Sequence, residues 1–212
     1  MILKQKKNIP FFQFPNLEGF SDLRHGIFTK NGGDSNGPYQ SLNVSFSVGD
    51  DAHSVRANRR LISQCMDGKE LVFVNQVHGT EVLQIRESKP DIQKSYDAMV
   101  TDVRDILLVI QVADCQAVLM YDPVRRVVAN VHSGWRGSVA NIVGHTVTVM
   151  KKDFGCNPRH IVAGIGPSLG PCCAEFVNYK TEIPESLWKY KDVSDHFDFR
   201  AITTEQLCNA GV

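Results

Sequence analysis

Two histidines and one cysteine, His78, Cys115 and His132, stand where apolar segments of the chain end. Two imidazoles and one thiolate are ligands that suit zinc, and three protein ligands leave the fourth tetrahedral position open for water. Water at such a zinc has its pKa lowered to about 7, so it supplies hydroxide at neutral pH. The three residue types therefore allow a catalytic zinc site.

The same residue types support other interpretations. A histidine at a strand end is more often structural, and a lone buried cysteine usually packs as a small hydrophobe. No two of the three candidates lie at a short, metal-like spacing in the sequence. Cys115 as a nucleophile, with either histidine as its base, would instead make a cysteine hydrolase or amidase. Asp114 would then orient the base. The residues alone do not decide between the zinc site and the cysteine hydrolase.

Hydrophobic patterns predict the elements that must position these residues. Continuous apolar runs predict strands that are covered on both faces. The predicted strands cover residues 70–79, 105–114, 117–122, 126–134 and 160–166. Helices are expected over residues 50–66 and 138–155, and the Gly-, Asn- and Ser-rich segment 29–43 is expected to form surface loops. This pattern indicates an α/β or α+β domain with a buried sheet.

Composition excludes several function classes. A length of 212 residues suits one domain with a full core. The 23 basic and 23 acidic residues balance, so no global field attracts nucleic acid or an anionic membrane. No apolar segment is long enough for a membrane helix or a signal-peptide core. The six cysteines form no CxxC pair, which favours reduced thiols and a cytoplasmic protein. The residues carry no indication of an oligomeric state.

Two loops add candidate binding and catalytic groups. The segment HSGWRGSVANI, residues 132–142, predicts a turn into a helix, where free amides and the Arg136 guanidinium could hold phosphate or a carboxylate. The segment GIGPSLGPCCAEF, residues 164–176, lacks the spacing of a dinucleotide loop and the lysine of a phosphate loop. We expect a rigid loop there, with Glu175 as an acid or base and with Cys172 and Cys173 as structural residues.

Several motifs together resemble the YfiH family of laccase-domain proteins, formerly described as multicopper polyphenol oxidases. The motifs are RHGIFTKNGGDSNGPYQSLN, NQVHGT, DAMVTD, ADCQAVLMYDP, VHSGWRG and GIGPSLGPCCAEF, and the resemblance runs from about Arg24 to Val212. It implies a single α+β domain over residues 1–212, with a mixed sheet core flanked by helices and a distant relation to bacterial deamidating toxins. It also implies zinc bound by His78, Cys115 and His132.

The resemblance further implies a purine nucleoside enzyme. Such an enzyme phosphorolyses adenosine, inosine, guanosine and methylthioadenosine, and deaminates adenosine. Deamination needs a carboxylate that moves protons, for which Asp114 and Glu175 are candidates. Phosphorolysis needs a cation that holds phosphate, for which Arg59 and Arg136 are candidates. The expected substrate contacts also include Asn43, Gln76 and His25.

Two alternative activities remain open, and the chain is expected to differ from the family at its C-terminal end. The alternatives are a laccase-like polyphenol oxidase that uses copper, and a Cys/His amide hydrolase that acts on a cell-wall precursor. A multicopper site needs several histidine-rich ligand sets, and this chain has only seven histidines, so zinc is expected before copper. The family generally continues past the segment QLCNAGV, and we expect the chain to lack this C-terminal segment.

Overall fold

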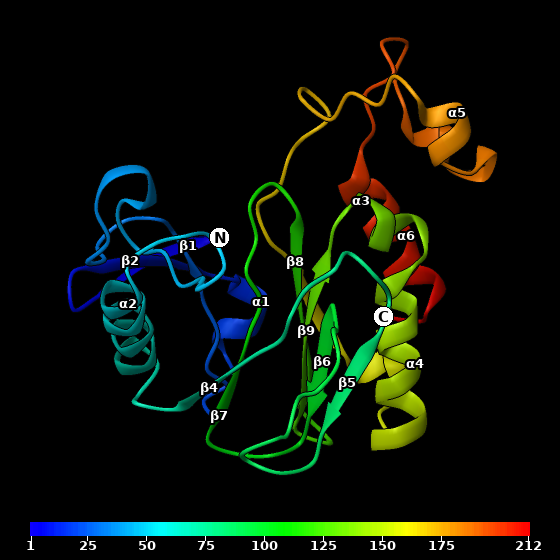
Figure 1. Ribbon diagram of the computed structural model, residues 1–212. Coiled ribbons are helices and arrows are strands. Elements are labelled where there is room, and N and C mark those ends of the chain that lie inside the picture. Colours follow the sequence, from blue (N-terminus) through cyan, green and yellow to red (C-terminus); the bar gives the residue numbers. More distant parts are fainter. The chain divides into compact units, whose positions relative to one another are not determined.

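The computed structural model describes residues 1–212, which form two compact units (Figure 1). The first unit contains residues 1–72 and 104–111. The second unit contains residues 73–103 and 112–212, and it carries the three candidate metal ligands. No helix combines the length and the apolar character needed to cross a membrane.

The first unit is built on a small antiparallel sheet and one long helix. Its elements are β1 (Ile2–Lys6), β2 (Ile9–Gln13), α1 (Pro15–Glu18), β3 (Ile27–Phe28), η1 (Gly37–Tyr39), α2 (Ala52–Cys65), β4 (Glu70–Phe73) and β7 (Ile106–Val109). Strands β1, β2 and β3 pair in that order, and β4 pairs with β7. Helix α2 begins at Asp51, whose carboxylate accepts a hydrogen bond from the backbone N–H of Ser54 at 2.8 Å.

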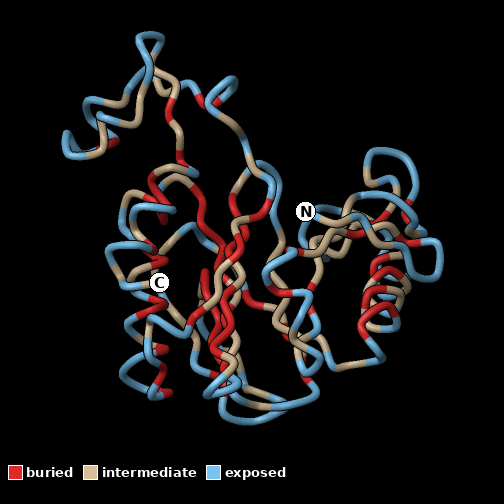
Figure 2. Tube along the Cα trace, turned by 180° about the vertical axis from the view of Figure 1, so that it is seen from behind, coloured by how far each residue is buried: buried red, intermediate tan, exposed pale blue.

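The second unit contains a mixed five-stranded sheet in the order β10-β8-β9-β6-β5. The strands are β5 (Val82–Ile85), β6 (Ala98–Thr101), β8 (Gln116–Asp122), β9 (Val127–Ser133) and β10 (Val162–Ile165). Only β5 and β6 run parallel, and the other three pairs are antiparallel. Successive residues along β6 and β8 are buried, so both faces of these strands are covered (Figure 2). For β8 this is what its apolar run predicts.

Helices α3 (Trp135–Val139) and α4 (Ile142–Phe154) pack on the sheet of the second unit, and α6 (Phe199–Asn209) packs against both of them. The remaining helices of this unit are η2 (Pro158–His160), α5 (Tyr179–Glu182) and η3 (Glu185–Tyr190). Helix α4 packs against β6 and β9 (Figure 1). Its Ile142, Val147 and Met150 are buried in the same core cluster as residues of these strands. Each such fully buried side chain stabilises the fold by about 1.5–3 kcal/mol relative to an exposed one. The α+β class and the mixed sheet flanked by helices are as predicted, and one domain over residues 1–212 stays a prediction.

Several predicted elements have other bounds in the structure. The helix expected over 138–155 is interrupted because Asn141 adopts a left-handed conformation and caps α4, its side chain accepting from the N–H of Gly144 at 3.0 Å. The strand expected over 105–114 ends at Val109. Strands β1, β2, β3, β5 and β6 and helix α6 were not predicted from the sequence. These elements are short or only weakly periodic, so tertiary pairing decides them.

Candidate metal centre

Strands β8 and β9 bring Cys115 next to His132. The two strands are antiparallel, with Gln116 opposite Ser133 and Ala117 opposite His132. The beginning of β8 therefore meets the end of β9. Cys115 directly precedes β8, and the expectation that it ends a strand is wrong, because the chain between β7 and β8 is irregular from residue 110. The antiparallel register, not a shared strand end, places the thiol beside the imidazole.

His78 reaches the same place from a loop. Strand β4 ends at Phe73, so His78 lies in the segment between β4 and β5. The expectation that His78 stands at the end of a strand is therefore wrong. Its backbone is left-handed, with φ of 60°. This conformation is uncommon for a residue with a side chain. It turns three successive N–H groups, those of Val77, His78 and Gly79, toward the carboxylate of Asp97.

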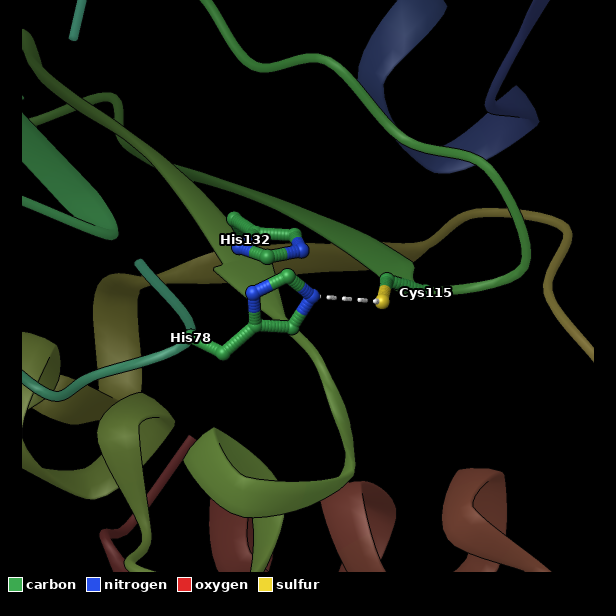
Figure 3. A group of neighbouring side chains, drawn as sticks. All are labelled: His78, Cys115 and His132. Atoms are coloured by element: carbon green, nitrogen blue, oxygen red, sulfur yellow. Dashed lines mark hydrogen bonds between the residues drawn. The ribbon is translucent and has the colours of Figure 1, made fainter. Parts of the chain in front are cut away.

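The three side chains point toward one another (Figure 3). One ligand atom from each of His78, Cys115 and His132 lies within 4.8 Å of the others. The sulfur of Cys115 is 3.7 Å from Nε2 of His78 (Figure 3). The two imidazole rings meet edge to face, with centroids 4.7 Å apart. The cluster can therefore bind one metal ion through two nitrogens and one sulfur.

Asp97 holds both histidines of the cluster. Its side chain is fully buried, and it accepts backbone hydrogen bonds from Val77, His78 and Gly79 at 3.2, 2.9 and 2.7 Å. Its Oδ1 also lies 2.7 Å from Nδ1 of His132. Because an ionised carboxylate only accepts, Nδ1 carries the proton and Nε2 keeps its lone pair for a metal. The donor set thus fits a metal ion, including the partner that orients one ligand.

Asp97 is a residue of the site that the sequence does not predict. It directly precedes β6 within the motif DAMVTD, and nothing in the motif distinguishes it from an aspartate at the surface. The feature that could have indicated it is a single carboxylate immediately before a strand whose four residues are all buried. A buried charge requires compensating partners, and those partners lie about twenty and thirty-five residues away in the sequence.

Gly134 has no side chain, and the atoms of His78 and Cys115 occupy the space that a side chain would need. A Cβ atom at this position would lie 2.6 Å from Cδ2 of His78 and 3.2 Å from the sulfur of Cys115. Its own φ of −71° and ψ of 170° suit any residue, so the requirement is for space and not for conformation. The Ser-Gly turn after β9 therefore lets the three ligands approach one another.

The electrostatics of the cluster favour a bound cation. Burial raises the pKa of Cys115, and the charges of Asp114 and Asp97 raise it further. Burial lowers the pKa of His132, although its hydrogen bond to Asp97 acts in the opposite direction. Burial also acts to raise the pKa of Asp97, but the hydrogen bonds from His132 and three backbone N–H groups outweigh it, so the net pKa is lowered. A metal ion would stabilise the thiolate and neutral imidazoles together.

The three predicted catalytic residues all belong to the second unit. Asp114 is exposed beside Cys115, and its carbonyl accepts a hydrogen bond from Leu169 at 2.8 Å. Glu175 is exposed, and its backbone bridges that of His196. Arg136 is exposed in α3, with its guanidinium 5.0 Å from the ring of Trp135. Of the three, Asp114 is the one that the structure places next to a candidate ligand.

The predicted substrate-binding residues fall in both units. Gln76 is half-buried two residues before His78, in the same loop. Asn43, Arg59 and His25 belong to the first unit. The Asn43 amide donates to Asp50 at 2.8 Å, and the Nε of Arg59 donates to the carbonyl of Val44 at 2.8 Å.

His25 is buried, and its Nε2 accepts the backbone N–H of Phe14 at 2.9 Å. Burial lowers the pKa of His25, which keeps this imidazole neutral. In the structure it holds the start of α1, and its role in substrate binding stays a prediction.

Comparison with known proteins relates the chain to one family and to several named relatives. The family model described as multi-copper polyphenol oxidoreductase laccase matches residues 24–212. A purine nucleoside phosphorylase from Bacteroides thetaiotaomicron is 36% identical over 166 residues, which are 74% of this chain and 62% of that protein. The purine nucleoside phosphorylase YlmD from Geobacillus stearothermophilus is 34% identical over 164 residues, 73% of this chain and 60% of that protein. These alignments span less than two thirds of the relatives' length.

Two solved structures share the fold. The crystal structure of YlmD from Geobacillus stearothermophilus superposes with a TM-score of 0.85 and 29% identity, covering all of this chain and 84% of the other. The crystal structure of the hypothetical protein YfiH from Bacillus licheniformis gives a TM-score of 0.80 and 28% identity, covering 88% of this chain and 77% of the other. Both support the α+β fold described above.

Proposed function

Since the chain belongs to the laccase-domain family, we propose that it is a zinc-dependent purine nucleoside enzyme. The proposed reactions are phosphorolysis of adenosine, inosine, guanosine and methylthioadenosine, and hydrolytic deamination of adenosine. Relatives named purine nucleoside phosphorylase support the substrate class. The observation that carries the proposal is the cluster of His78, Cys115 and His132, whose ligand atoms lie within 4.8 Å of one another.

Zinc is the proposed ion because the donor set is two imidazoles and one thiolate. Such sets suit zinc, and three protein ligands leave one coordination position for water or substrate. When bound there, zinc supplies a Lewis acid and a water of lowered pKa. Copper would also bind these nitrogen and sulfur atoms, since its affinity for such sites is higher. All six cysteines are free thiols, which fits the proposed cytoplasmic setting.

The remaining residues have proposed roles in moving protons and holding substrate. We assign proton transfer to Asp114 before Glu175, because Asp114 directly precedes the ligand Cys115 and its charge acts on that thiol. In deamination this carboxylate would deliver a proton to the leaving ammonia. Gln76 approaches the same region through the loop that carries His78.

Phosphorolysis places different demands on the chain. Phosphate attacks the anomeric carbon of the sugar while the purine leaves with the glycosidic electron pair, so the phosphate must be positioned and the leaving base stabilised. Arg136 and Arg59 are the proposed phosphate-binding cations. Asn43 and His25 are proposed to contribute on the nucleoside side.

The test combines elemental analysis with turnover of adenosine, measured with and without phosphate and before and after chelation. We expect about one zinc per chain, adenine release that depends on phosphate, and inosine formation that does not. Both products should disappear on chelation and return with zinc. A fully metallated chain that turns over no purine nucleoside would contradict the proposed function.

One observation favours a second candidate, a Cys/His amide hydrolase. The Cys115 sulfur lies 3.7 Å from Nε2 of His78, within reach of a nucleophile and its base. This candidate predicts rapid alkylation of Cys115 and amide hydrolysis that survives a chelator. An oxidase in the sense of the family description would instead require copper and oxygen uptake with a phenol. The structure groups three ligands at one place, which suits a single ion.

A further inference from the structure

A second pair of thiols lies outside the metal centre. Cys172 and Cys173 are adjacent in the sequence, both are exposed, and their sulfur atoms are 3.2 Å apart. The expectation that these residues are merely structural does not account for two exposed thiols in contact. Neither belongs to the cluster that can hold the metal ion.

The turn that carries this pair is anchored on both sides. The N–H groups of Cys173 and Ala174 both donate to the carbonyl of Gly170, at 3.0 and 3.1 Å. Before the turn, Leu169 donates to Asp114 at 2.8 Å. After it, the carbonyl of the buried Ala174 accepts the N–H of Phe197 at 3.0 Å. The thiols are therefore held side by side on a preformed turn.

We propose that Cys172 and Cys173 form a thiol–disulfide exchange site that reacts with small-molecule disulfides. The thiolate of Cys172 attacks one sulfur of the small disulfide, which releases one small thiolate and leaves a mixed disulfide. The thiolate of Cys173 then attacks the Cys172 sulfur, which releases the second small thiolate and closes a disulfide between neighbouring residues. Two protein thiols are oxidised, the small disulfide is reduced to two thiols, and the two protons go to the released thiolates.

The order of attack follows from the contact between the two thiols. The hydrogen bond to Cys172, and then its charge, raise the pKa of Cys173. Because its pKa is raised, Cys173 is assigned the second step. The second step is intramolecular, so it needs no second thiol from solution.

The closed form is expected to open readily. Neighbouring Cα atoms are about 3.8 Å apart, whereas disulfides usually join Cα atoms about 4.4–6.8 Å apart. A disulfide under this constraint is easier to reduce than an ordinary structural one, and labile disulfides are typical of exchange and regulation. The site is therefore suited to reversible oxidation.

The test uses the purified, metal-loaded chain and glutathione disulfide, followed by acid quenching and mass analysis of tryptic peptides. One peptide, residues 160–180, contains only the Cys172–Cys173 pair, and another, residues 201–212, contains only the exposed Cys208. We expect the first peptide to lose two hydrogens without a glutathione adduct, while Cys208 retains an adduct. The adduct on the first peptide should be at least about tenfold lower than on the second.

Single substitutions separate the two steps. With C173S the ring cannot close, so Cys172 should retain the glutathione adduct at the level of Cys208. Dithiothreitol should restore the wild-type peptide to its starting mass. The proposal is overturned if wild-type residues 160–180 keep a stable adduct as Cys208 does, or if this peptide stays reduced while Cys208 reacts. Because peptide mass is the readout, the result does not depend on nucleoside turnover.

Discussion

The carboxylate of Asp97 hydrogen-bonds Nδ1 of His132 at 2.7 Å, across thirty-five residues of sequence and with both side chains buried. The same carboxylate accepts the backbone N–H of His78 at 2.9 Å. One buried group therefore orients one candidate ligand through its ring and the other through its backbone. This arrangement is how proteins commonly set the tautomer and direction of a metal-binding histidine.

Substitution of Asp97 by asparagine should weaken metal binding. D97N keeps the shape but removes the charge that holds His132 in its Nδ1–H tautomer, so zinc affinity should fall by about 10- to 100-fold. Competition with a chromophoric chelator measures this directly. D102N is the matched control, because Asp102 is exposed, follows β6 and pairs only with Arg86 at the surface. Equal affinities for D97N and D102N would contradict the role of Asp97.

Removal of any one ligand should abolish metal binding and turnover together. H78A, C115A and H132A each leave two ligands, so the loss of affinity should exceed the about 10- to 100-fold that loss of a supporting group costs. Elemental analysis and adenosine turnover are the measurements. H53A and C208A are controls, since His53 and Cys208 are exposed and lie outside the cluster. Full zinc content in C115A would show that the thiol is not a ligand.

A methyl group at Gly134 should disturb the centre with little effect on backbone conformation. G134A places Cβ 2.6 Å from Cδ2 of His78 and 3.2 Å from the sulfur of Cys115, so the His78 ring must shift from its present position. We expect metal affinity to fall at least about tenfold. G19A is the control, since a Cβ at Gly19 meets no atom within 4 Å and its φ is negative. For G19A we expect a negligible change in Tm. Unchanged zinc affinity in G134A would contradict the idea that the ligands need the space at Gly134.

Cys156 should resist alkylation and should lower stability at alkaline pH. Burial, followed by the charge of Asp122, raises the pKa of the Cys156 thiol to about 12 from an ordinary 9.0. Because the folded pKa is the higher one, its contribution to stability is complete below pH 9 and is lost as pH rises toward 12. At pH 8, iodoacetamide should modify the exposed Cys208 and spare Cys156.

The alkaline effect is measured by urea unfolding between pH 8 and pH 10.5. Other groups titrate in this range, so the readout is the difference between wild type and C156A. The free energy of unfolding of the wild type should fall more steeply with pH, by up to about 1.4 kcal/mol per pH unit. Parallel pH profiles for the two proteins would mean that the Cys156 thiol titrates at its ordinary pKa.

The sequence by itself determined the chemical types at the centre and the elements with strong local signals. Apolar runs predicted β8, β9 and β10, and helix α2 followed from its periodicity and acidic start. The residue types of His78, Cys115 and His132 identified a zinc-like donor set before any geometry was known. These predictions depend on residues close together in the chain.

Only the tertiary structure decided how those residues meet. The register that sets Gln116 opposite Ser133, the left-handed backbone of His78 and the space at Gly134 all depend on segments far apart in sequence. Asp97 is not recognisable from the sequence because an aspartate is usually exposed, and His132 becomes its neighbour only when β6 pairs with β9. Helix α6 has weak periodicity of its own, and it forms where Ile202 and Leu207 are buried. Long-range pairing, which local patterns do not encode, therefore turns three scattered side chains into one centre.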